Sequence, residues 1–233
     1  MTVLFSETKV SDLSKTSIFT IIIGLLAVGS GGVLFIELAD DVLENEKFAI
    51  DIVAADIVSK SPAWIIEAMG WITEGGSVTL ITILSIILFV GLIFFIPVSK
   101  WVAAYLAISM IGISVLTKGL KILFARDRPE LLDQYDGTGY SFPSGHTTGS
   151  SVFYGFMIYL IVISPLKKPA KWSINIGIGL LILLIALSRV FLNVHYFTDI
   201  LGGLTIGISW LLICITALEL MLWRQRKRQL RKQ

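Results

Sequence analysis

The chain has 233 residues, of which 55% are hydrophobic and 15% are charged, and its mean hydropathy is +0.83. A water-soluble domain of this size has a mean hydropathy well below zero, so the composition excludes an ordinary soluble protein and indicates an integral membrane protein. The net charge of +2 gives no reason to expect nucleic-acid binding, and Cys214, the only cysteine, excludes an intrachain disulfide and a cysteine metal site.

Six apolar stretches are long enough to cross a membrane, which takes about 20 apolar residues per helix. They are residues 17–38, 77–98, 101–124, 144–164, 172–191 and 198–223. Lys9 and Lys15 before the first stretch also suit a secretory signal peptide, but the stretch is long and no A-x-A cleavage site follows it. The sequence therefore predicts an all-α fold, a polytopic bundle of six transmembrane helices that forms one domain over residues 1–233.

The connection 39–76 between the first two stretches is long and acidic. Within it, residues 62–71 have the pattern of a short amphipathic helix that lies on the membrane surface. Trp64 and Trp71 fit such a position, because tryptophan is enriched where a membrane meets water.

Lysine and arginine predict the orientation, since they gather in cytoplasmic segments. The tail 224–233 and the loop 165–171 are basic, so we expect both to be cytoplasmic, and six spans place the N-terminus with them. The acidic connection 39–76 and the loops 125–143 and 192–197 then lie outside. We expect a multi-pass protein of the plasma membrane whose short surface helix is extracytoplasmic.

The loop 125–143 departs from this charge pattern, because it carries arginines on the predicted outer side. Lys121 and Arg128 are seven residues apart, about two helical turns, so they share one face if the helix persists until Pro129 ends it. Cations at a helix mouth are costly and usually have a functional partner, and a bound anion would be one. The alternative is a lysine that extends to the membrane surface beside a solvated arginine.

The stretch SFPSGHTTGS, residues 141–150, puts one of only two histidines at the start of an apolar helix. Ser144 or Ser141 suits a helix cap, and Gly145 lets a ligand approach the backbone closely. The free N–H groups of a first helical turn favour an anion such as phosphate, and His146 is positioned to exchange a proton with it. The alternative is an ordinary capped helix with an interfacial histidine.

The stretch SRVFLNVHYFTD, residues 188–199, holds the second histidine. His195 and Asp199 are four residues apart and share a helical face, so the carboxylate can accept the imidazole N–H and orient the other nitrogen as a nucleophile. Arg189 closes the preceding span, and Asn193 marks the turn that brings Arg189 and His195 to the same side of the membrane. A capping aspartate and an interfacial histidine are the alternative.

All three clusters fall on the same predicted side of the membrane and together describe an oxyanion site with a nucleophile and an acid beside it. Their residues resemble the signature of the type 2 phosphatidic acid phosphatase family, which is related to the vanadium-dependent haloperoxidases: K-x6-RP, PSGH and SR-x5-H-x3-D. The chain has these motifs in this order and with intact spacing at residues 121–129, 143–146 and 188–199. Residues before about 100 carry no such signature.

The resemblance implies a role for each matching residue. His195 attacks phosphorus and forms a phosphohistidine, and Asp199 orients His195. His146 protonates the leaving oxygen and then activates the water that releases phosphate. The groups that hold the phosphoryl oxygens are Lys121, Arg128, Ser144, Gly145 and Arg189. We expect no cofactor and no metal, because no carboxylate cluster of metal-binding type accompanies these residues.

The resemblance thus implies an integral membrane lipid phosphatase, with phosphatidylglycerophosphate or phosphatidic acid as the favoured substrate and the lipid bilayer as its setting. Undecaprenyl diphosphate is an alternative substrate, and Arg126 would then supply a countercharge for the second phosphate. A phosphotransferase that passes the phosphoryl group to a second lipid would share the same intermediate. The sequence gives no indication of the oligomeric state.

A lipid transporter or lipid-binding protein is the alternative from another functional class. Its cations would bind a headgroup without cleaving it. Binding alone does not require His146, His195 and Asp199 together, so we favour the enzyme. A haloperoxidase is not expected, because a six-span bundle does not resemble an aqueous vanadate enzyme.

Overall fold

The computed structural model describes residues 15–44, 48–129, 135 and 138–230. Within these ranges the regular elements are eight α-helices, and the described residues contain no strand. The helices are α1 (Lys15–Leu43), α2 (Ala49–Ser59), α3 (Ala63–Glu74), α4 (Val78–Phe94), α5 (Lys100–Phe124), α6 (Gly145–Ile163), α7 (Lys168–Phe191) and α8 (Phe197–Leu230). The predicted all-α class is confirmed.

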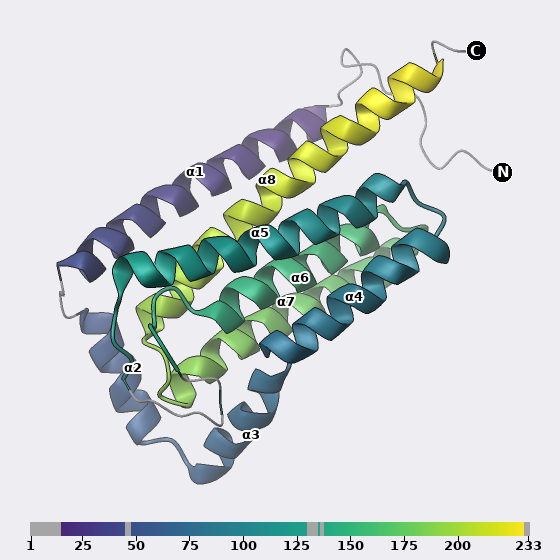
Figure 1. The fold of residues 1–233 in the computed structure, drawn as a ribbon. Coiled ribbons are helices and arrows are strands. Elements are labelled where there is room, and N and C mark those ends of the chain that lie inside the picture. The colour runs from purple at the N-terminus through teal and green to yellow at the C-terminus, as the bar shows by residue number, and fades with distance from the viewer. Residues whose placement is uncertain (1–14, 45–47, 130–134, 136–137, 231–233) are drawn as a thin grey trace.

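The long helices form a bundle around α6, which packs against α5, α7 and α8. The outer helix α1 packs along α8, and α4 packs along α5. The two short helices α2 and α3 lie across one end of this bundle (Figure 1). There α2 contacts α7 and α8, while α3 contacts α7, so the connection predicted only as long and acidic covers the ends of two long helices.

Small residues allow α6 and α8 to approach each other closely. A Cβ added to Gly203 would lie 2.9 Å from the Cβ of Thr147 and 3.1 Å from the carbonyl oxygen of Ser144. One turn further, a Cβ on Gly207 would lie 3.0 Å from the Cβ of Ser151. Such glycine-lined contacts are common between membrane helices, because the hydrophobic effect does not drive helices together within a bilayer. This contact joins the helix that carries Asp199 to the helix that begins at Gly145.

Five described helical segments are long and apolar enough to cross a membrane. They are Ala63–Phe94, Lys100–Phe124, Gly145–Ile163, Lys168–Phe191 and Phe197–Gln225. These segments contain or overlap the last five predicted stretches. The first predicted stretch, 17–38, falls within α1, but the side chains of residues 15–27 lie outside the described part of the chain. Six spans and a single domain therefore stay predictions.

The predicted surface helix at 62–71 corresponds to α3, although its position at the membrane surface stays a prediction. Trp64 and Trp71 on this helix are 69% and 77% exposed. A turn at Gly75 and Gly76 separates α3 from α4, yet the two helices together make one continuous apolar segment. No pattern in the sequence predicted α2, whose 11 residues include Asp51 and Asp56 and are too few to span a membrane.

The helix that carries Lys121 ends at Phe124, where the predicted stretch 101–124 ends, and does not persist to Pro129. It stops at Phe124, because Ala125 adopts a left-handed conformation with φ 46° and donates its N–H to the carbonyl of Lys121. Pro129 therefore does not end this helix, and Arg128 lies beyond it. Lys121 and Arg128 were expected to share a helical face only if the helix persisted to Pro129, and it does not. Lys121 lies in the last turn of α5, whereas Arg128 lies in the loop after it.

Candidate active site

The three predicted clusters lie at the end of the bundle covered by α2 and α3 (Figure 1). At this end α5 and α7 finish, and α6 and α8 begin. The opposite end holds the connections between α4 and α5 and between α6 and α7, together with the last turns of α8. The motif residues are thus gathered by topology, since each stands within about two turns of a helix end.

His195 and Asp199 form a buried pair at the start of α8. The His195 Nδ1 atom lies 3.1 Å from Oδ2 of Asp199, and the two side chains are 2% and 0% exposed. The same Oδ2 accepts the backbone N–H of Tyr196 at 2.9 Å. Because a carboxylate only accepts, the imidazole proton belongs on Nδ1, and the lone pair is left on Nε2. The predicted orientation of the imidazole by Asp199 agrees with this geometry.

Arg128 faces the other nitrogen of this imidazole. Its Nη1 donates to the Val194 carbonyl at 2.7 Å and lies 3.0 Å from Nε2 of His195. Two loop carbonyls, those of Gly139 and Thr138, hold the rest of the guanidinium at 2.9 Å and 3.0 Å. Burial lowers the pKa of His195 well below its usual value, and the charge of Arg128 lowers it further. His195 is therefore neutral, with its free electron pair directed toward a fixed cation.

Arg189 is fully buried in the last turn of α7. Its Nη1 donates to the hydroxyl of Thr73 at 2.7 Å, and its Nη2 donates to the Tyr135 carbonyl at 2.5 Å. Thr73 belongs to α3, so this short helix helps to orient a motif arginine. Lys121, in the last turn of α5, donates to the carbonyl of Tyr140. Both cations are held by backbone or hydroxyl oxygens.

The start of α6 forms another wall of the site. Ser144 is the N-terminal cap residue; it is fully buried, and its N–H donates to the Asp199 carbonyl at 3.1 Å. The hydroxyl of Ser144 accepts from Thr147 at 3.0 Å and caps no backbone N–H, so the predicted capping bond is not formed by that side chain. A Cβ on Gly145 would lie 3.9 Å from Cε of Lys121. His146 is 5% exposed, and a Cβ on Gly76 would lie 3.4 Å from its ring.

The turn between α7 and α8 brings the third cluster together. Asn193 has φ 54°, in the left-handed region, as its predicted position in a turn requires. The N–H groups of Val194 and His195 both donate to the carbonyl of Arg189 at 3.2 Å. The structure thus collects every predicted site residue at one end of the bundle: Lys121, Arg128, Ser144, Gly145, His146, Arg189, His195 and Asp199.

Sequence reasoning missed two charged residues at this site. Arg126 was considered only as a countercharge for a second phosphate, but its Nη1 donates to Oδ1 of Asp199 at 2.6 Å. Its Nη2 donates to Oδ2 of Asp51 at 3.0 Å. Asp51 belongs to α2, and nothing in the acidic connection singled it out. The arginines in the loop 125–143, which depart from the predicted charge pattern, were the available signal for Arg126.

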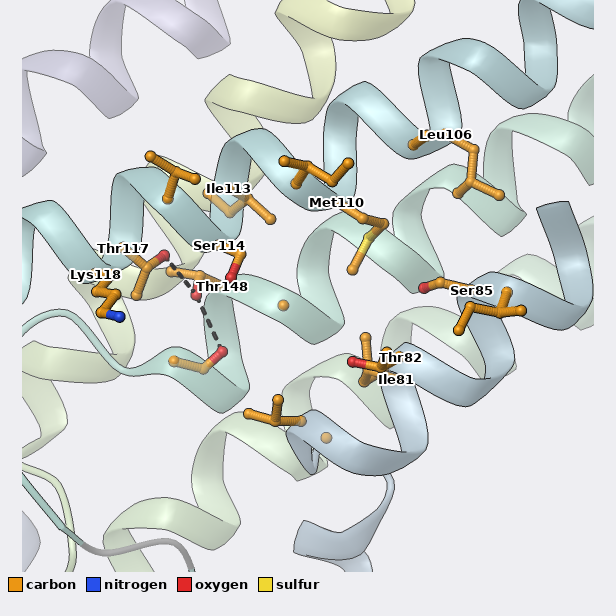
Figure 2. Close-up of a pocket in the computed structure, with 18 of the residues that line it drawn as sticks. Ile81, Thr82, Ser85, Leu106, Met110, Ile113, Ser114, Thr117, Lys118 and Thr148 are labelled. Carbon is orange, nitrogen blue, oxygen red and sulfur yellow. Dashed lines mark hydrogen bonds between the residues drawn. The ribbon is translucent and has the colours of Figure 1, made fainter.

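A largely apolar cavity of about 650 Å³ leads away from the site between α4, α5 and α6. Lys121 and Gly145 line its end near the site, while Phe89 and Leu106 line the far end. Figure 2 shows Thr82 and Ser85 of α4 across the cavity from side chains of α5. From Leu106 to Lys121 the cavity follows fifteen residues of helix, roughly 22 Å at the usual rise.

Among the residues that the structure describes, no group of three or more His, Cys, Asp or Glu side chains is arranged to hold a metal ion. Besides Asp199, the charged groups near His195 include cations held by backbone carbonyls and hydroxyls. Such an arrangement suits a tetrahedral oxyanion, whose negative charge preorganised cations stabilise.

The fold and the site define a membrane protein with a buried histidine–aspartate pair beneath fixed cations. The profile of the PAP2 superfamily matches residues 101–222, more than half of the chain, and the protein belongs to this superfamily. The matched range contains all three motifs and, wholly or for the most part, four of the eight helices described. These four are α5 from its second residue, α6, α7 and most of α8, while α1 to α4 precede the matched range.

Two proteins with similar sequences are named as phosphatases. The chain is 31% identical over 156 residues to phosphatidylglycerophosphatase B of Bacillus subtilis, an alignment that covers 66% of this chain and 75% of that protein. It is 27% identical over 121 residues to lipid A 1-phosphatase of Rhizobium johnstonii, covering 48% of this chain and 45% of that protein. The chain therefore matches less than half the length of the second relative.

Solved structures share the fold. The crystal structure of a transmembrane PAP2-type phosphatidylglycerolphosphate phosphatase from Bacillus subtilis superposes with a TM-score of 0.71 at 26% identity, covering 82% of this chain and 96% of that one. Aquifex aeolicus LpxE superposes with a TM-score of 0.57 at 22% identity, covering 73% of this chain and 98% of that one. The second likeness concerns the fold alone.

Proposed function

We propose that this protein is a membrane lipid phosphatase that removes the terminal phosphate of a lipid phosphomonoester, with phosphatidylglycerophosphate or phosphatidic acid as the favoured substrate. Membership of the PAP2 superfamily supports phosphatase chemistry, and the Bacillus subtilis relative supports the first of the two substrates. The observation that carries the proposal is the buried His195, whose Nδ1 faces Asp199 and whose Nε2 faces Arg128.

In the first step, Nε2 of His195 attacks phosphorus, and the bond from phosphorus to the lipid oxygen breaks. His146 gives its proton to that oxygen, so the lipid leaves as an alcohol. The imidazole keeps its Nδ1 proton and becomes positively charged, and Asp199 stabilises this charge. Arg128 moves its hydrogen bond from Nε2 to a phosphoryl oxygen, which frees the electron pair for attack.

In the second step, His146 removes a proton from water as the water attacks phosphorus. The phosphorus–nitrogen bond then breaks, and inorganic phosphate leaves a neutral His195. Lys121, Arg128 and Arg189 stabilise the negative charge that spreads over the phosphoryl oxygens in both steps. The N–H groups of the first turn of α6, next to Ser144 and Gly145, add further positive dipole.

The apolar cavity supports a lipid substrate, because it leads from Lys121 between helices whose outer residues are exposed, such as Val115 and Ile86. Acyl chains would lie there while the phosphate is under the cations. Lys118 lines the same cavity one turn from Lys121. It would provide the countercharge for the second phosphate of phosphatidylglycerophosphate, whereas the sequence suggested Arg126 as a countercharge only for undecaprenyl diphosphate.

This assignment makes Lys118 a test of substrate preference. Phosphatidic acid has one phosphate, whereas phosphatidylglycerophosphate has two. We therefore expect Lys118→Gln to lower kcat/KM for phosphatidylglycerophosphate by about tenfold, the effect of losing one charged hydrogen bond, and to change that for phosphatidic acid much less. An equal loss for both lipids, measured as phosphate release, would contradict the role given to Lys118.

We also propose that the site faces the extracytoplasmic side. The basic loop 165–171 and the basic last turns of α8 belong to the end of the bundle opposite the site, and basic segments favour the cytoplasm. The measurement is labelling of single-cysteine variants in intact cells. A cysteine in the exposed part of α3 should react with a membrane-impermeant thiol reagent; labelling only after lysis would reverse the orientation.

The central experiment is a phosphate-release panel with purified protein in detergent or vesicles. Its substrates are phosphatidylglycerophosphate, phosphatidic acid, lysophosphatidic acid and undecaprenyl diphosphate, each tested also with His195→Ala. We expect release from at least one of the first two and none from the variant. When the reaction is run in labelled water, hydrolysis should place labelled oxygen in the released phosphate. Transfer to a second lipid would leave the phosphoryl group unlabelled. Wild-type protein that binds these lipids and releases no phosphate would support the non-hydrolytic alternative.

A further inference from the structure

Arg126 connects the candidate catalytic carboxylate to helix α2. Its Nη1 donates to Oδ1 of Asp199 at 2.6 Å, and its Nη2 donates to Oδ2 of Asp51 at 3.0 Å. Asp51 also accepts from Thr198, at 2.9 Å from the backbone N–H and at 2.8 Å from the hydroxyl. These bonds join α2, the loop after α5 and the first turn of α8, which are far apart in the sequence.

We infer that Arg126 and Asp51 are positioning residues that set the orientation and the charge of the His195–Asp199 pair, and that α2 is thereby part of the catalytic apparatus. The inference rests on the proposed phosphohistidine mechanism. It extends that mechanism to the acidic connection between the first two predicted spans, to which no role was assigned.

The geometry fixes the Asp199 carboxylate from both sides. Oδ2 accepts from His195 and from the Tyr196 N–H, so Oδ1 is left for Arg126. Arg126 is itself restrained, since its guanidinium carbon lies 4.1 Å from the centre of the Tyr196 ring and 5.5 Å from that of Phe48. A carboxylate bound at both oxygens cannot rotate, and the imidazole that it holds keeps one orientation.

The charges explain why Asp51 accompanies Arg126. Arg126 alone would neutralise Asp199, which would then stabilise a cationic His195 less well. Asp51 returns the group of three to a net charge of −1 directly behind the imidazole. The side chains of Arg126, Asp51 and Asp199 are 13%, 8% and 0% exposed, so water screens these interactions only weakly. The net negative charge therefore stabilises the positive charge that His195 acquires during the attack.

A second cavity makes this arrangement accessible to a small solute. It has a volume of about 400 Å³, and its lining includes Asp51, Arg126, His195 and Tyr196. Removing the Arg126 side chain would enlarge this space beside Asp199. Guanidinium ion, added from solution, has the shape and charge of the missing group and can donate to both carboxylates.

The experiment compares Asp51→Asn, Arg126→Ala and the double variant with Asp56→Asn. Asp56 is the matched control, because it lies on the same helix, is 59% exposed and pairs only with Lys60 among the contacts described. We expect Asp51→Asn and Arg126→Ala each to lower kcat roughly tenfold or more with little change in KM, as for partners that orient a catalytic group. The double variant should lose little more than Arg126→Ala, since the two act as one unit.

Millimolar guanidinium should restore part of kcat to Arg126→Ala and none to His195→Ala. If Arg126→Ala does not fold, Arg126→Lys replaces it, because it keeps the charge and loses the forked donor. The inference is overturned if Asp51→Asn behaves like Asp56→Asn, or if losses in kcat come with equal increases in KM and no guanidinium rescue. Wild-type activity that survives in His195→Ala would instead refute the proposed function.

Discussion

Both ends of the helical bundle carry basic residues, but these are buried or hydrogen-bonded at one end and exposed at the other. At the end covered by α2 and α3, Arg189 is fully buried and Arg128 is held by carbonyl oxygens. At the other end, Lys168, Arg224 and Arg228 are exposed. Buried cations are costly unless they have partners, whereas exposed cations tolerate variation.

At the buried end the position and shape of a cation matter, whereas at the exposed end only the sign of its charge matters. At the exposed end any basic residue would favour the same orientation in the membrane. At the buried end each cation has a defined direction, and a change of shape should matter as much as a change of charge. The following predictions test that distinction.

The largest effect is expected for Asp199→Asn, which keeps the shape and removes the charge. An asparagine amide can donate to Nδ1 of His195, which moves the imidazole proton to Nε2 and removes the electron pair needed for attack. We expect kcat to fall about a thousandfold with a small change in KM. Steady-state phosphate release measures both constants, and an equal loss of lipid affinity would remove the role given to Asp199.

Arg189→Lys should have the next largest effect, because it keeps the charge and changes the shape. Lysine cannot bond Thr73 and the Tyr135 carbonyl while facing a phosphoryl group as the planar fork does. We expect about a hundredfold loss of kcat/KM. The same replacement at the exposed end, Arg224→Lys, is the control and should leave activity unchanged. Equal effects of both variants would erase the contrast between the two ends.

The pH profile tests the setting of His195. Burial and the neighbouring cations lower its pKa, so the imidazole stays neutral as pH falls below the usual value of about 6.5. The acid limb of kcat/KM, which reports the free enzyme, should therefore have its midpoint below pH 6.5, with a second limb at higher pH where the acid loses its proton. A profile that is flat, with chemistry limiting, would count against two catalytic histidines.

The smallest effect is expected from removal of metal ions. If the fixed cations alone stabilise the phosphoryl oxygens, excess EDTA should leave turnover unchanged within error. The control adds Mg²⁺ back after dialysis. Loss of activity in EDTA and its return with Mg²⁺ would show that the cations at the buried end are insufficient for the reaction.

Much of the candidate site could be predicted from local spacing. His195 and Asp199 are four residues apart on a helix, and the turn at Asn193 needs a residue that tolerates a left-handed conformation. Both signals are read within a few residues, so they do not depend on knowing the tertiary fold. The helical class followed from apolar length in the same way.

The partners of this pair could not be predicted from the sequence. Asp51 lies 147 residues from Thr198 in the chain, and no periodicity relates the two. The left-handed conformation of Ala125, which follows the end of α5 at Phe124, was also not predicted, because alanine favours continuing a helix. Local sequence patterns contain no information on long-range hydrogen bonds or on the tertiary constraints that set single backbone dihedrals.

The cavity between α4 and α5 is lined partly by residues on the flank of the bundle, and this bears on which substrate concentration sets the rate of the proposed reaction. Val115 and Ile86, which line it, are 67% and 58% exposed on the flank of the bundle. A substrate that arrives along this flank diffuses in two dimensions, so its relevant concentration is a mole fraction in the bilayer. Diluting it with inert phospholipid at constant total amount should slow catalysis, and the protein would then sense membrane composition.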